Sequence, residues 1–347
     1  MACSKNRLNR PKWERYGVLW LGYLAIILAL GPLGLGSAEA QSLTKVSIRL
    51  DWLVDGSYTG EAVAVDKGFY REQGLDLTLN PGGANANPIQ LTVGGSDLVG
   101  NAGSIPAIFL ARSNDLPVKA VWTALQKHPY CWLVRKDGGI NGPQDFVGKR
   151  VSIQATGRPL IDAVIAKYKL PRDKVTIVVS GEPRILRAGQ VDAYGTWCTD
   201  FGAIEAAGGE AQIKQLLLWD MGIHLYAYPY FVTDDTLKKH PDVLAKVLAG
   251  SAKGWGWAAD HPDEAVDSVL KYSKDLKRDF ELRQLKLILP FVFTEATKDK
   301  GWGWMEPAVW QEAIDIYGTL GLMKNPVKPN DAMTQDILIR VPDRPKR

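Results

Sequence analysis

The chain has 347 residues, enough for one large or two ordinary domains with a sizeable core, and its formal net charge is +4. Part of that positive excess lies at the N-terminus, so the rest of the chain is nearly balanced. It contains no basic patch of the kind that binds nucleic acid, and the composition therefore argues against a nucleic-acid partner.

The N-terminus has the three parts of a secretory signal. Basic residues from Lys5 to Arg15 precede an apolar run over residues 18–30, and the small-residue pattern Ala38-Glu39-Ala40 follows. This order predicts a signal peptide over residues 1–40 that is cleaved near Ala40, and hence an exported, periplasmic protein. An uncleaved anchor helix is the alternative. No later stretch is long and apolar enough to cross a membrane.

Removing the leader leaves two cysteines, Cys131 and Cys198. An exported protein could pair them, but two cysteines do not form a disulfide framework. A buried, unpaired role is the favoured interpretation.

The residues after the leader alternate between strand and helix patterns. Val46, Ile48 and Leu50 alternate with polar residues as in a half-buried strand, residues 59–73 read as a helix stopped by Gly74, and residues 75–79 read as a second strand. A helix, a short strand and a glycine-rich turn follow. This rhythm predicts an α/β fold with a mainly parallel sheet.

A second α/β unit starts near Lys136 and repeats the strand-then-helix pattern. From Asp234 to Tyr317 the sequence turns mostly helical, and the tail from Asn325 reads as irregular. The pentapeptide Lys-Gly-Trp-Gly-Trp occurs at 253–257 and again at 300–304. We interpret both copies as aromatic packing in the late helical region, with a ligand-lining role as the alternative.

Signatures of catalysis are scarce. The segment from Gly142 to Arg150 resembles a phosphate-binding loop, but it has one residue too many between its glycines and lacks the final serine or threonine. No nucleophile elbow occurs, and the four histidines are scattered without metal-ligand spacing. We therefore predict no catalytic residue, no metal site and no cofactor.

Binding chemistry is better represented, because aromatic, acidic and small residues follow several predicted strands. Ligands of open α/β sheets lie beyond the carboxyl ends of strands. A single aromatic residue there is usually packing, but rings, carboxylates and glycines at repeated strand ends favour a site for a planar ligand. The segments concerned are residues 51–58, 100–106, 154–159 and 194–200, together with Tyr226, Tyr228 and Tyr230, which would share one face if that segment is extended.

Four segments carry a resemblance to a known family: RLDW…YTGEAVAVDKGFYREQGLDLTL, GGSDLVGNAGSIPAIFLARSNDLPVKAVW, GPQDFVGKRVSI and LRAGQVDAYGTW. Together they resemble the thiamine-pyrimidine-synthase-like periplasmic binding proteins, the solute-binding components of ABC importers for thiamine pyrimidine precursors, riboflavin or sulfonates. The resemblance implies a type II periplasmic binding protein fold, with two lobes that are each a mixed sheet flanked by helices, and two crossovers at the hinge. Lobe 1 would comprise residues 43–132 plus 234–347, and lobe 2 residues 133–232.

The same resemblance implies that the ligand lies between the lobes. The rings of Trp52, Tyr58 and Trp197 would stack on it or line the cleft, Asp55 would accept a hydrogen bond from an amine or ring N–H, and Thr156 with Arg158 would hold any acidic group. The full set of ligand-binding residues expected by position is Trp52, Asp55, Tyr58, Asn101, Ser104, Thr156, Arg158, Trp197 and Tyr228.

One departure from the family pattern bears on function. Enzymatic relatives use a histidine, within an Asn-His-x-Gly motif, where this chain has Tyr58, and they carry a cysteine-rich run that this chain lacks. The resemblance thus favours a monomeric carrier of a small planar solute (pyrimidine, flavin, aromatic acid or sulfonate) that docks on an ABC permease and its ATPase. The alternatives are a pyridoxal-phosphate-dependent pyrimidine synthase using Lys67 or another lysine, and a ligand-sensing module for a membrane receptor.

Overall fold

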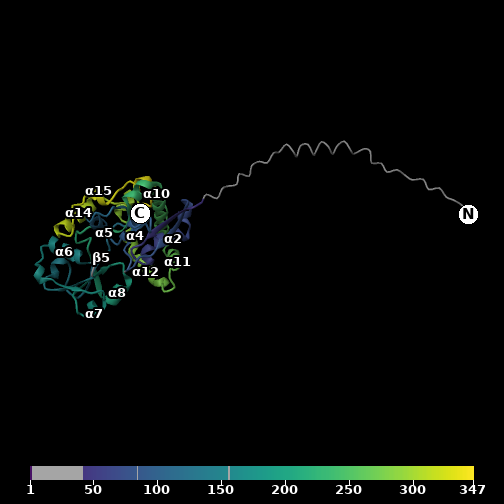
Figure 1. Ribbon diagram of the computed structural model, residues 1–347. Helices are drawn as coiled ribbons and strands as arrows, with labels where there is room; N and C mark the ends of the chain where they lie inside the picture. Colours follow the sequence, from purple (N-terminus) through teal and green to yellow (C-terminus); the bar gives the residue numbers. More distant parts are fainter. Residues whose placement is uncertain (2–41, 84, 155–156) are drawn as a thin grey trace. The chain divides into compact units, whose positions relative to one another are not determined.

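The computed structural model describes Met1 and residues 42–83, 85–154 and 157–347. Apart from Met1, the predicted signal peptide lies outside these residues. Leu43–Arg347 forms one compact unit (Figure 1). Within the described residues, no helix combines the length and apolar character needed to span a bilayer.

The first sheet has five strands in the order β2-β1-β3-β10-β4. β1 pairs in parallel with β2 and β3, whereas β10 runs antiparallel to β3 and β4. Alternate residues of β1 and β2 are buried, as a sheet covered by helices requires. The strands are β1 (Thr44–Arg49), β2 (Leu75–Asn80), β3 (Val99–Asn101), β4 (Val118–Leu125) and β10 (Ala227–Thr233).

Helices from both ends of the chain cover this sheet. The first part of the chain supplies η1 (Gly56–Tyr58), α2 (Thr59–Asp66), α3 (Phe69–Glu72), α4 (Pro88–Val93) and α5 (Ile105–Ser113). The last part supplies α9 (Asp234–Lys239), α10 (Pro241–Asp260), α11 (Pro262–Val269), α12 (Arg278–Val292), α13 (Glu295–Lys300), α14 (Pro307–Thr319), α15 (Pro329–Ala332) and η5 (Leu338–Arg340). α2 packs on α10, so residues far apart in sequence share one core.

The second sheet also has five strands, in the order β7-β6-β8-β5-β9. β6 pairs in parallel with β7 and β8, and β5 runs antiparallel to β8 and β9. Its strands are β5 (Tyr130–Arg135), β6 (Arg150–Ile153), β7 (Thr176–Val179), β8 (Ala193–Trp197) and β9 (Ile213–Leu217). Its helices, whose labelled members lie together in Figure 1, are η2 (Pro143–Phe146), α6 (Arg158–Lys167), η4 (Arg172–Lys174), α7 (Arg184–Arg187) and α8 (Phe201–Ala207).

Each sheet therefore mixes parallel and antiparallel pairs, as the family resemblance implied, and the expectation of a mainly parallel sheet is wrong. The reason is the connectivity. β5 follows the crossover at residues 126–129 and β10 follows the crossover at residues 218–226, and each of these two strands runs antiparallel to both of its neighbours. Residues 130–132 lie in the second sheet and residues 227–232 in the first.

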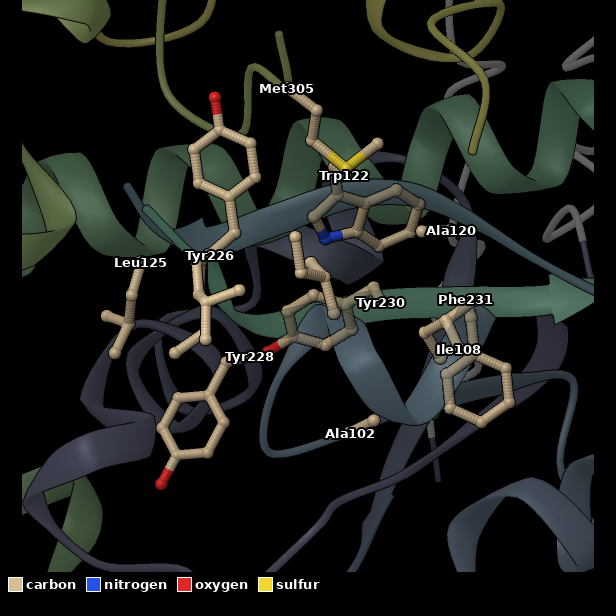
Figure 2. Close-up of a cluster of buried hydrophobic side chains, with 14 of the residues drawn as sticks. Ala102, Ile108, Ala120, Trp122, Leu125, Tyr226, Tyr228, Tyr230, Phe231 and Met305 are labelled. Carbon is tan, nitrogen blue, oxygen red and sulfur yellow. The ribbon is translucent and has the colours of Figure 1, made fainter. Parts of the chain in front are cut away.

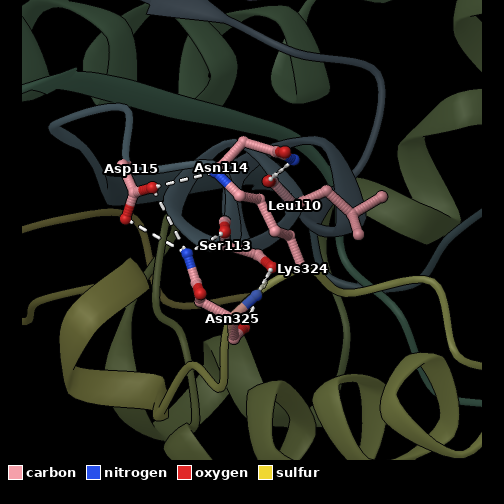
Figure 3. Close-up of polar contacts among 6 residues, drawn as sticks. All are labelled: Leu110, Ser113, Asn114, Asp115, Lys324 and Asn325. Atoms are coloured by element: carbon pink, nitrogen blue, oxygen red, sulfur yellow. Dashed lines mark hydrogen bonds and ion pairs between the residues drawn. The ribbon is translucent and has the colours of Figure 1, made fainter.

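Two local expectations need correction. The helix expected over residues 59–73 is divided into α2 and α3, because Gly68 adopts a left-handed conformation with φ of 76° and ends the first helix. The tail expected to be irregular contains α15 and η5. It begins at a turn in which Asn325 and Ser113, at the end of α5, exchange hydrogen bonds of 2.9 Å (Figure 3).

The two cysteines form a disulfide, which overturns the favoured unpaired interpretation. Cys131 lies on β5 and Cys198 directly after β8, and because these strands are neighbours the two Cα atoms are 5.7 Å apart. The interpretation of the repeated pentapeptides as packing is confirmed for Trp255 and Trp302, which are fully buried with ring centroids 6.5 Å apart.

Candidate functional site

Four aromatic rings meet where strands of both sheets end. Tyr58 follows β1, Tyr228 lies at the start of β10, Trp197 ends β8, and His128 lies on the first crossover. The Tyr58 and Tyr228 rings stack with centroids 4.8 Å apart, and Trp197 lies 5.1 Å from Tyr228 and 5.1 Å from His128. We call these four residues the aromatic cluster. It joins the two sheets, because Trp197 belongs to the second and Tyr228 to the first.

Hydrogen bonds fix the first-sheet side of the aromatic cluster. The backbone N–H of Trp52 donates to the Tyr58 hydroxyl at 3.1 Å, and that hydroxyl donates to Oδ1 of Asn101 at 3.3 Å. Asn101 is fully buried and its amide nitrogen lies 3.5 Å from the carbonyl oxygen of Pro229. The loop after β1, the end of β3 and the start of β10 are thus connected through Tyr58. The Trp52 side chain itself is 47% exposed.

The backbone at Tyr228 is unusual. Its φ is 50°, in the left-handed region that non-glycine residues seldom adopt, and its N–H lies 3.3 Å from the carbonyl oxygen of Gly103. The segment is therefore not regularly extended, and the three tyrosines expected on one face separate. Tyr226 accepts a hydrogen bond from the backbone of Glu306, and Tyr230 stacks on Trp122. Figure 2 shows the rings of Tyr226 and Tyr228 projecting in opposite directions.

Two half-buried carboxylates of the loop after β1 lie beside the aromatic cluster. Burial raises the pKa of Asp51 to about 6, against a lowering contribution from its hydrogen bond with the Gly103 backbone. Burial also raises the pKa of Asp55, whose Oδ1 accepts the Ser57 N–H at 2.8 Å. The pKa values of Tyr58 and Tyr228 rise well above normal through burial, and the charges of Asp51 and Asp55 raise them further.

A cavity of about 430 Å³ opens beside Asp51. Its wall includes Ala102, in the small-residue turn after β3, and the residues that lead into α4. The small side chains of this turn leave room for a ligand to approach the backbone. The volume suits a single ring system with small substituents.

The remaining predicted site residues lie differently. Ser104 precedes α5 and forms an isolated bridge with Ala227, next to Tyr228. Arg158 is exposed in the first turn of α6, where its Nε donates to Asp162 at 2.7 Å, so its described contacts do not run to the aromatic cluster. Thr156 lies outside the described residues.

Sequence reasoning missed two members of the site. Asp51 is not among the predicted ligand-binding residues, although its position directly beyond a strand end is a signal for such a role. His128 gives no sequence signal, because the histidines show no common spacing. It is buried, burial lowers its pKa to about 3, and its Nδ1 accepts the Tyr130 N–H at 3.1 Å. It is thus a neutral, aromatic acceptor at pH 7.

The enzymatic alternatives would need a lysine or a metal ion at the site, and the described residues place neither there. Lys67 is exposed at the end of α2, with its ammonium 4.2 Å from the centroid of the Trp257 ring. No group of three or more histidine, cysteine, aspartate or glutamate side chains within residues 42–83, 85–154 and 157–347 is placed to hold a metal ion.

Two mixed sheets flanked by helices and joined by two crossovers define the class of the fold as that of periplasmic binding proteins. The periplasmic aliphatic sulphonate binding protein SsuA from Escherichia coli superimposes with a TM-score of 0.66 at 15% sequence identity, over 85% of this chain and 93% of that chain. The chain belongs to the NMT1/THI5-like family, whose model matches residues 56–265.

Relatives within reach of sequence comparison include binding proteins and enzymes. The formylaminopyrimidine-binding protein of Halalkalibacterium halodurans is 23% identical over 86% of this chain and 92% of its own length. The riboflavin-binding protein RibY of Chloroflexus aurantiacus is 22% identical over 92% of this chain and 97% of its own. A 4-amino-5-hydroxymethyl-2-methylpyrimidine phosphate synthase of Legionella pneumophila is 23% identical over 75% of this chain and 84% of its own.

Proposed function

We propose that this protein is the periplasmic solute-binding component of an ABC importer, and that it encloses a small planar or aromatic solute between its two lobes. The observation that carries the proposal is the contact of Trp197, from the second sheet, with Tyr228, from the first, at 5.1 Å. An aromatic contact at facing strand ends of two lobes suits capture of a flat ring, because each lobe can offer one stacking surface.

Polar groups lie around these rings, and their hydrogen bonds can fix the orientation of the bound solute and so discriminate between solutes. Asn101, Asp51 and Asp55 belong to the first lobe, while His128 lies on the crossover between the lobes. A solute that contacts both lobes stabilises their closed arrangement by its differential affinity for that arrangement, which is how a hinged protein responds to a ligand. Micromolar affinity corresponds to about −8 kcal/mol, which stacked rings and a few oriented hydrogen bonds can supply.

The proposal includes the path of the solute. Residues 1–40 direct export, the mature monomer collects the solute in the periplasm, and the closed form docks on a membrane permease driven by an ATPase. The two binding-protein relatives each match over more than nine tenths of their own length, which supports a role of the kind that their names describe.

Native mass spectrometry of the protein purified from its own periplasm tests the proposal by identifying a retained solute. Titration of that solute against Trp197→Ala should then show affinity at least about tenfold weaker, because one stacked ring contributes roughly 1–3 kcal/mol. Trp257→Ala is the matched control, since that ring stacks on His261 and lies under Lys67, outside the aromatic cluster. Equal affinity of Trp197→Ala and the parent would refute the site.

Synthases within the family make catalysis the competing function, and the site residues argue against it. Tyr58 stands where the resemblance expects the histidine of the enzymes, and Lys67 contacts Trp257 instead of the aromatic cluster. Addition of pyridoxal phosphate should therefore give no absorbance band from an adduct with Lys67. The spectra of the parent and of Lys67→Ala should be the same. Such a band, together with formation of a pyrimidine product, would establish the enzymatic function.

A further inference from the structure

His128 is held in place by the backbone around it. Its own N–H donates to the carbonyl oxygen of Leu225 at 2.8 Å, so the two crossovers meet at this residue. The carbonyl oxygen of Pro129 accepts the Cys198 N–H at 2.7 Å, which ties the first crossover to the end of β8. His128 is only 4% exposed, and its ring contacts Trp197 at an interplanar angle of 62°. The imidazole therefore has a fixed place within the aromatic cluster.

One hydrogen bond decides which nitrogen of this imidazole carries the proton. The Tyr130 N–H donates to Nδ1 of His128 at 3.1 Å. A backbone N–H can only donate, so Nδ1 presents a lone pair and the proton of the neutral ring lies on Nε2. Burial lowers the pKa of His128 to about 3, so the doubly protonated ring does not compete at neutral pH. His128 thus combines an acceptor nitrogen that the backbone uses with an N–H donor at Nε2.

The Nε2–H donor has no acceptor among the described residues. The one side-chain hydrogen bond of His128 within residues 42–83, 85–154 and 157–347 is the bond that Nδ1 accepts from Tyr130. The Trp197 ring, which the imidazole contacts, carries an indole N–H, and this group is a donor only. A buried N–H without an acceptor destabilises the state that contains it. A bound molecule that brings an acceptor to this point is therefore favoured.

The same indole connects His128 to the first lobe. Trp197 pairs with Tyr130 across β5 and β8, and its ring centroid lies 5.1 Å from those of both His128 and Tyr228. A flat solute that contacts Trp197 where the lobes meet therefore lies next to the imidazole as well. Stacking alone leaves such a ring free to rotate in its own plane, whereas a hydrogen bond from the crossover fixes its orientation.

We infer that His128 is a specificity-determining residue, whose Nε2–H donates to an acceptor in the plane of the bound ring, such as a ring carbonyl oxygen or an unprotonated ring nitrogen. The inference rests on the proposed function and deepens it, because it names a polar group that the planar solute must carry. A ring that presents a C–H or N–H at this position leaves the donor without a partner. Such a ring should be bound less tightly.

Two neutral probes test the inference at pH 7: 1-indanone and indane share a fused bicyclic skeleton, and only 1-indanone carries an in-plane carbonyl. In a tryptophan-fluorescence titration, 1-indanone should bind at least about fivefold more tightly, although indane is the more hydrophobic molecule. In the protein labelled with ¹⁵N-histidine, the long-range ¹H–¹⁵N spectrum should show the His128 proton on Nε2. 1-Indanone should shift the resonance of that proton, and indane should not.

Two substitutions separate the donor from the structural role of the imidazole. Asparagine places an oxygen at the position of Nδ1, so His128→Asn can still accept the Tyr130 N–H but has no donor at the position of Nε2. Glutamine reaches the position of Nε2 with an amide N–H, so His128→Gln keeps the donor and gives up that bond. His128→Asn should abolish the preference for 1-indanone, and His128→Gln should retain most of it. Both variants lose the ring contact with Trp197, and the ratio of the two affinities cancels that loss.

The matched control is His240→Asn, the same substitution at an exposed residue directly before α10. It lies outside the aromatic cluster and should leave the preference for 1-indanone unchanged.

The outcomes separate this inference from the proposed function. The donor role is overturned by equal or tighter binding of indane, by no binding of 1-indanone, by a proton on Nδ1, or by a preference that persists in His128→Asn. Loss of the preference in both His128 variants would assign it to the ring as a whole and overturn the donor role too. The planar-solute site still stands if Trp197→Ala weakens binding of either probe. Loss of the proposed function itself requires that the solute found by native mass spectrometry bind without regard to Trp197.

Discussion

Glu61 is a fully buried carboxylic acid in the core of the first lobe. It lies on α2, its Oε1 accepts the indole N–H of Trp255 at 3.0 Å, and burial raises its pKa to about 7. A carboxyl whose pKa is higher in the folded than in the unfolded state binds more protons when folded, so stability falls as pH rises between the two pKa values. The window here runs from the unfolded value near 4.5 to about 7.

Glu61→Gln should therefore stabilise the protein at high pH. The amide keeps an oxygen for Trp255 but cannot ionise, so the variant should gain up to about 3 kcal/mol over the parent at pH 8 and little at pH 4.5. Urea denaturation at both pH values measures the difference. The exposed Glu264, changed to glutamine in the same way, is the control. A gain that is identical at the two pH values would contradict the burial argument.

Single residues differ in how far the sequence could predict their surroundings. The family resemblance predicts Trp52, Tyr58, Asn101, Trp197 and Tyr228 at the site by position. In the structure, hydrogen bonds and ring contacts connect these residues, Trp52 through its backbone N–H. Arg158 was selected for its charge, but Asp162 lies four residues later on the same helix and provides its partner. That spacing was visible in the sequence.

Other features left no sequence signal. The importance of His128 depends on which strand ends lie beside the crossover, and the φ of 50° at Tyr228 depends on how β10 enters its sheet. Neither can be read from residue types or periodicity, because both follow from the tertiary path of the chain.

The contact between α2 and α10 requires glycine on both helices. A Cβ atom on Gly254 would overlap the carbonyl oxygen of Gly60 and lie 2.9 Å from the Cβ of Ala64, and a Cβ on Gly60 would overlap the Trp255 ring. The first Lys-Gly-Trp-Gly-Trp segment thus sets how closely the two helices approach. Its glycine admits the neighbouring backbone, and its tryptophan fills the core beside it.

Gly254→Ala should destabilise the protein by about 1–3 kcal/mol, since overpacking outweighs the gain in helix propensity. Gly318→Ala in α14 is the matched control, because the nearest atom to its new methyl group is the flexible end of Met323, at 3.2 Å. That change should be neutral or stabilising by about 0.5–1 kcal/mol. Thermal and urea denaturation measure both variants, and equal effects would show that close packing does not decide the outcome.

At the scale of elements, periodicity predicted the alternation of strands and helices but not their directions. The strand at 75–79 and the helical region after Asp234 were predicted from local pattern. The antiparallel direction of β5 and of β10, each relative to the neighbours in its own sheet, was not predicted. Strand direction depends on the crossovers between the lobes, and these leave no mark on residue spacing.

The two lobes also touch away from the aromatic cluster. Phe201 of α8 meets Phe280 of α12 with ring centroids 5.5 Å apart, and Arg283 of α12 forms a 2.5 Å ion pair with Glu210. The Arg283 guanidinium lies 5.6 Å from the Phe201 ring centroid. We call these four residues the lobe latch. In this structure the lobe latch holds α8 and the residues after it against α12.

Phe280→Ala should shift the ligand-free protein toward open forms and weaken solute binding several-fold, because it removes an aromatic contact made only when the lobes meet. Small-angle scattering should show a larger radius of gyration. Lys286→Ala on the same helix is the control, since its ionic partner, Asp263, belongs to the first lobe. An unchanged radius and affinity in Phe280→Ala would show that the latch does not bias closure.

At the scale of the whole molecule, the family resemblance predicted the two-lobed fold, whereas composition and periodicity gave only an α/β class. The chain passes between the two sheets at residues 126–129 and 218–226, and no change of composition or periodicity marks either passage. The pairing of Cys131 with Cys198 follows from the adjacency of β5 and β8, and a sequence separation of 67 residues gives no indication of it.

The disulfide also has a practical consequence for anyone who produces the protein. Cys198 directly follows Trp197, and its N–H donates to the Pro129 carbonyl at 2.7 Å, so the covalent bond holds the end of β8 against the crossover that carries His128. Material expressed in a reducing cytosol would contain two thiols at this point instead of a bond. Batches that differ only in oxidation would then differ in how firmly Trp197 is held, and a thiol assay belongs beside every affinity measurement.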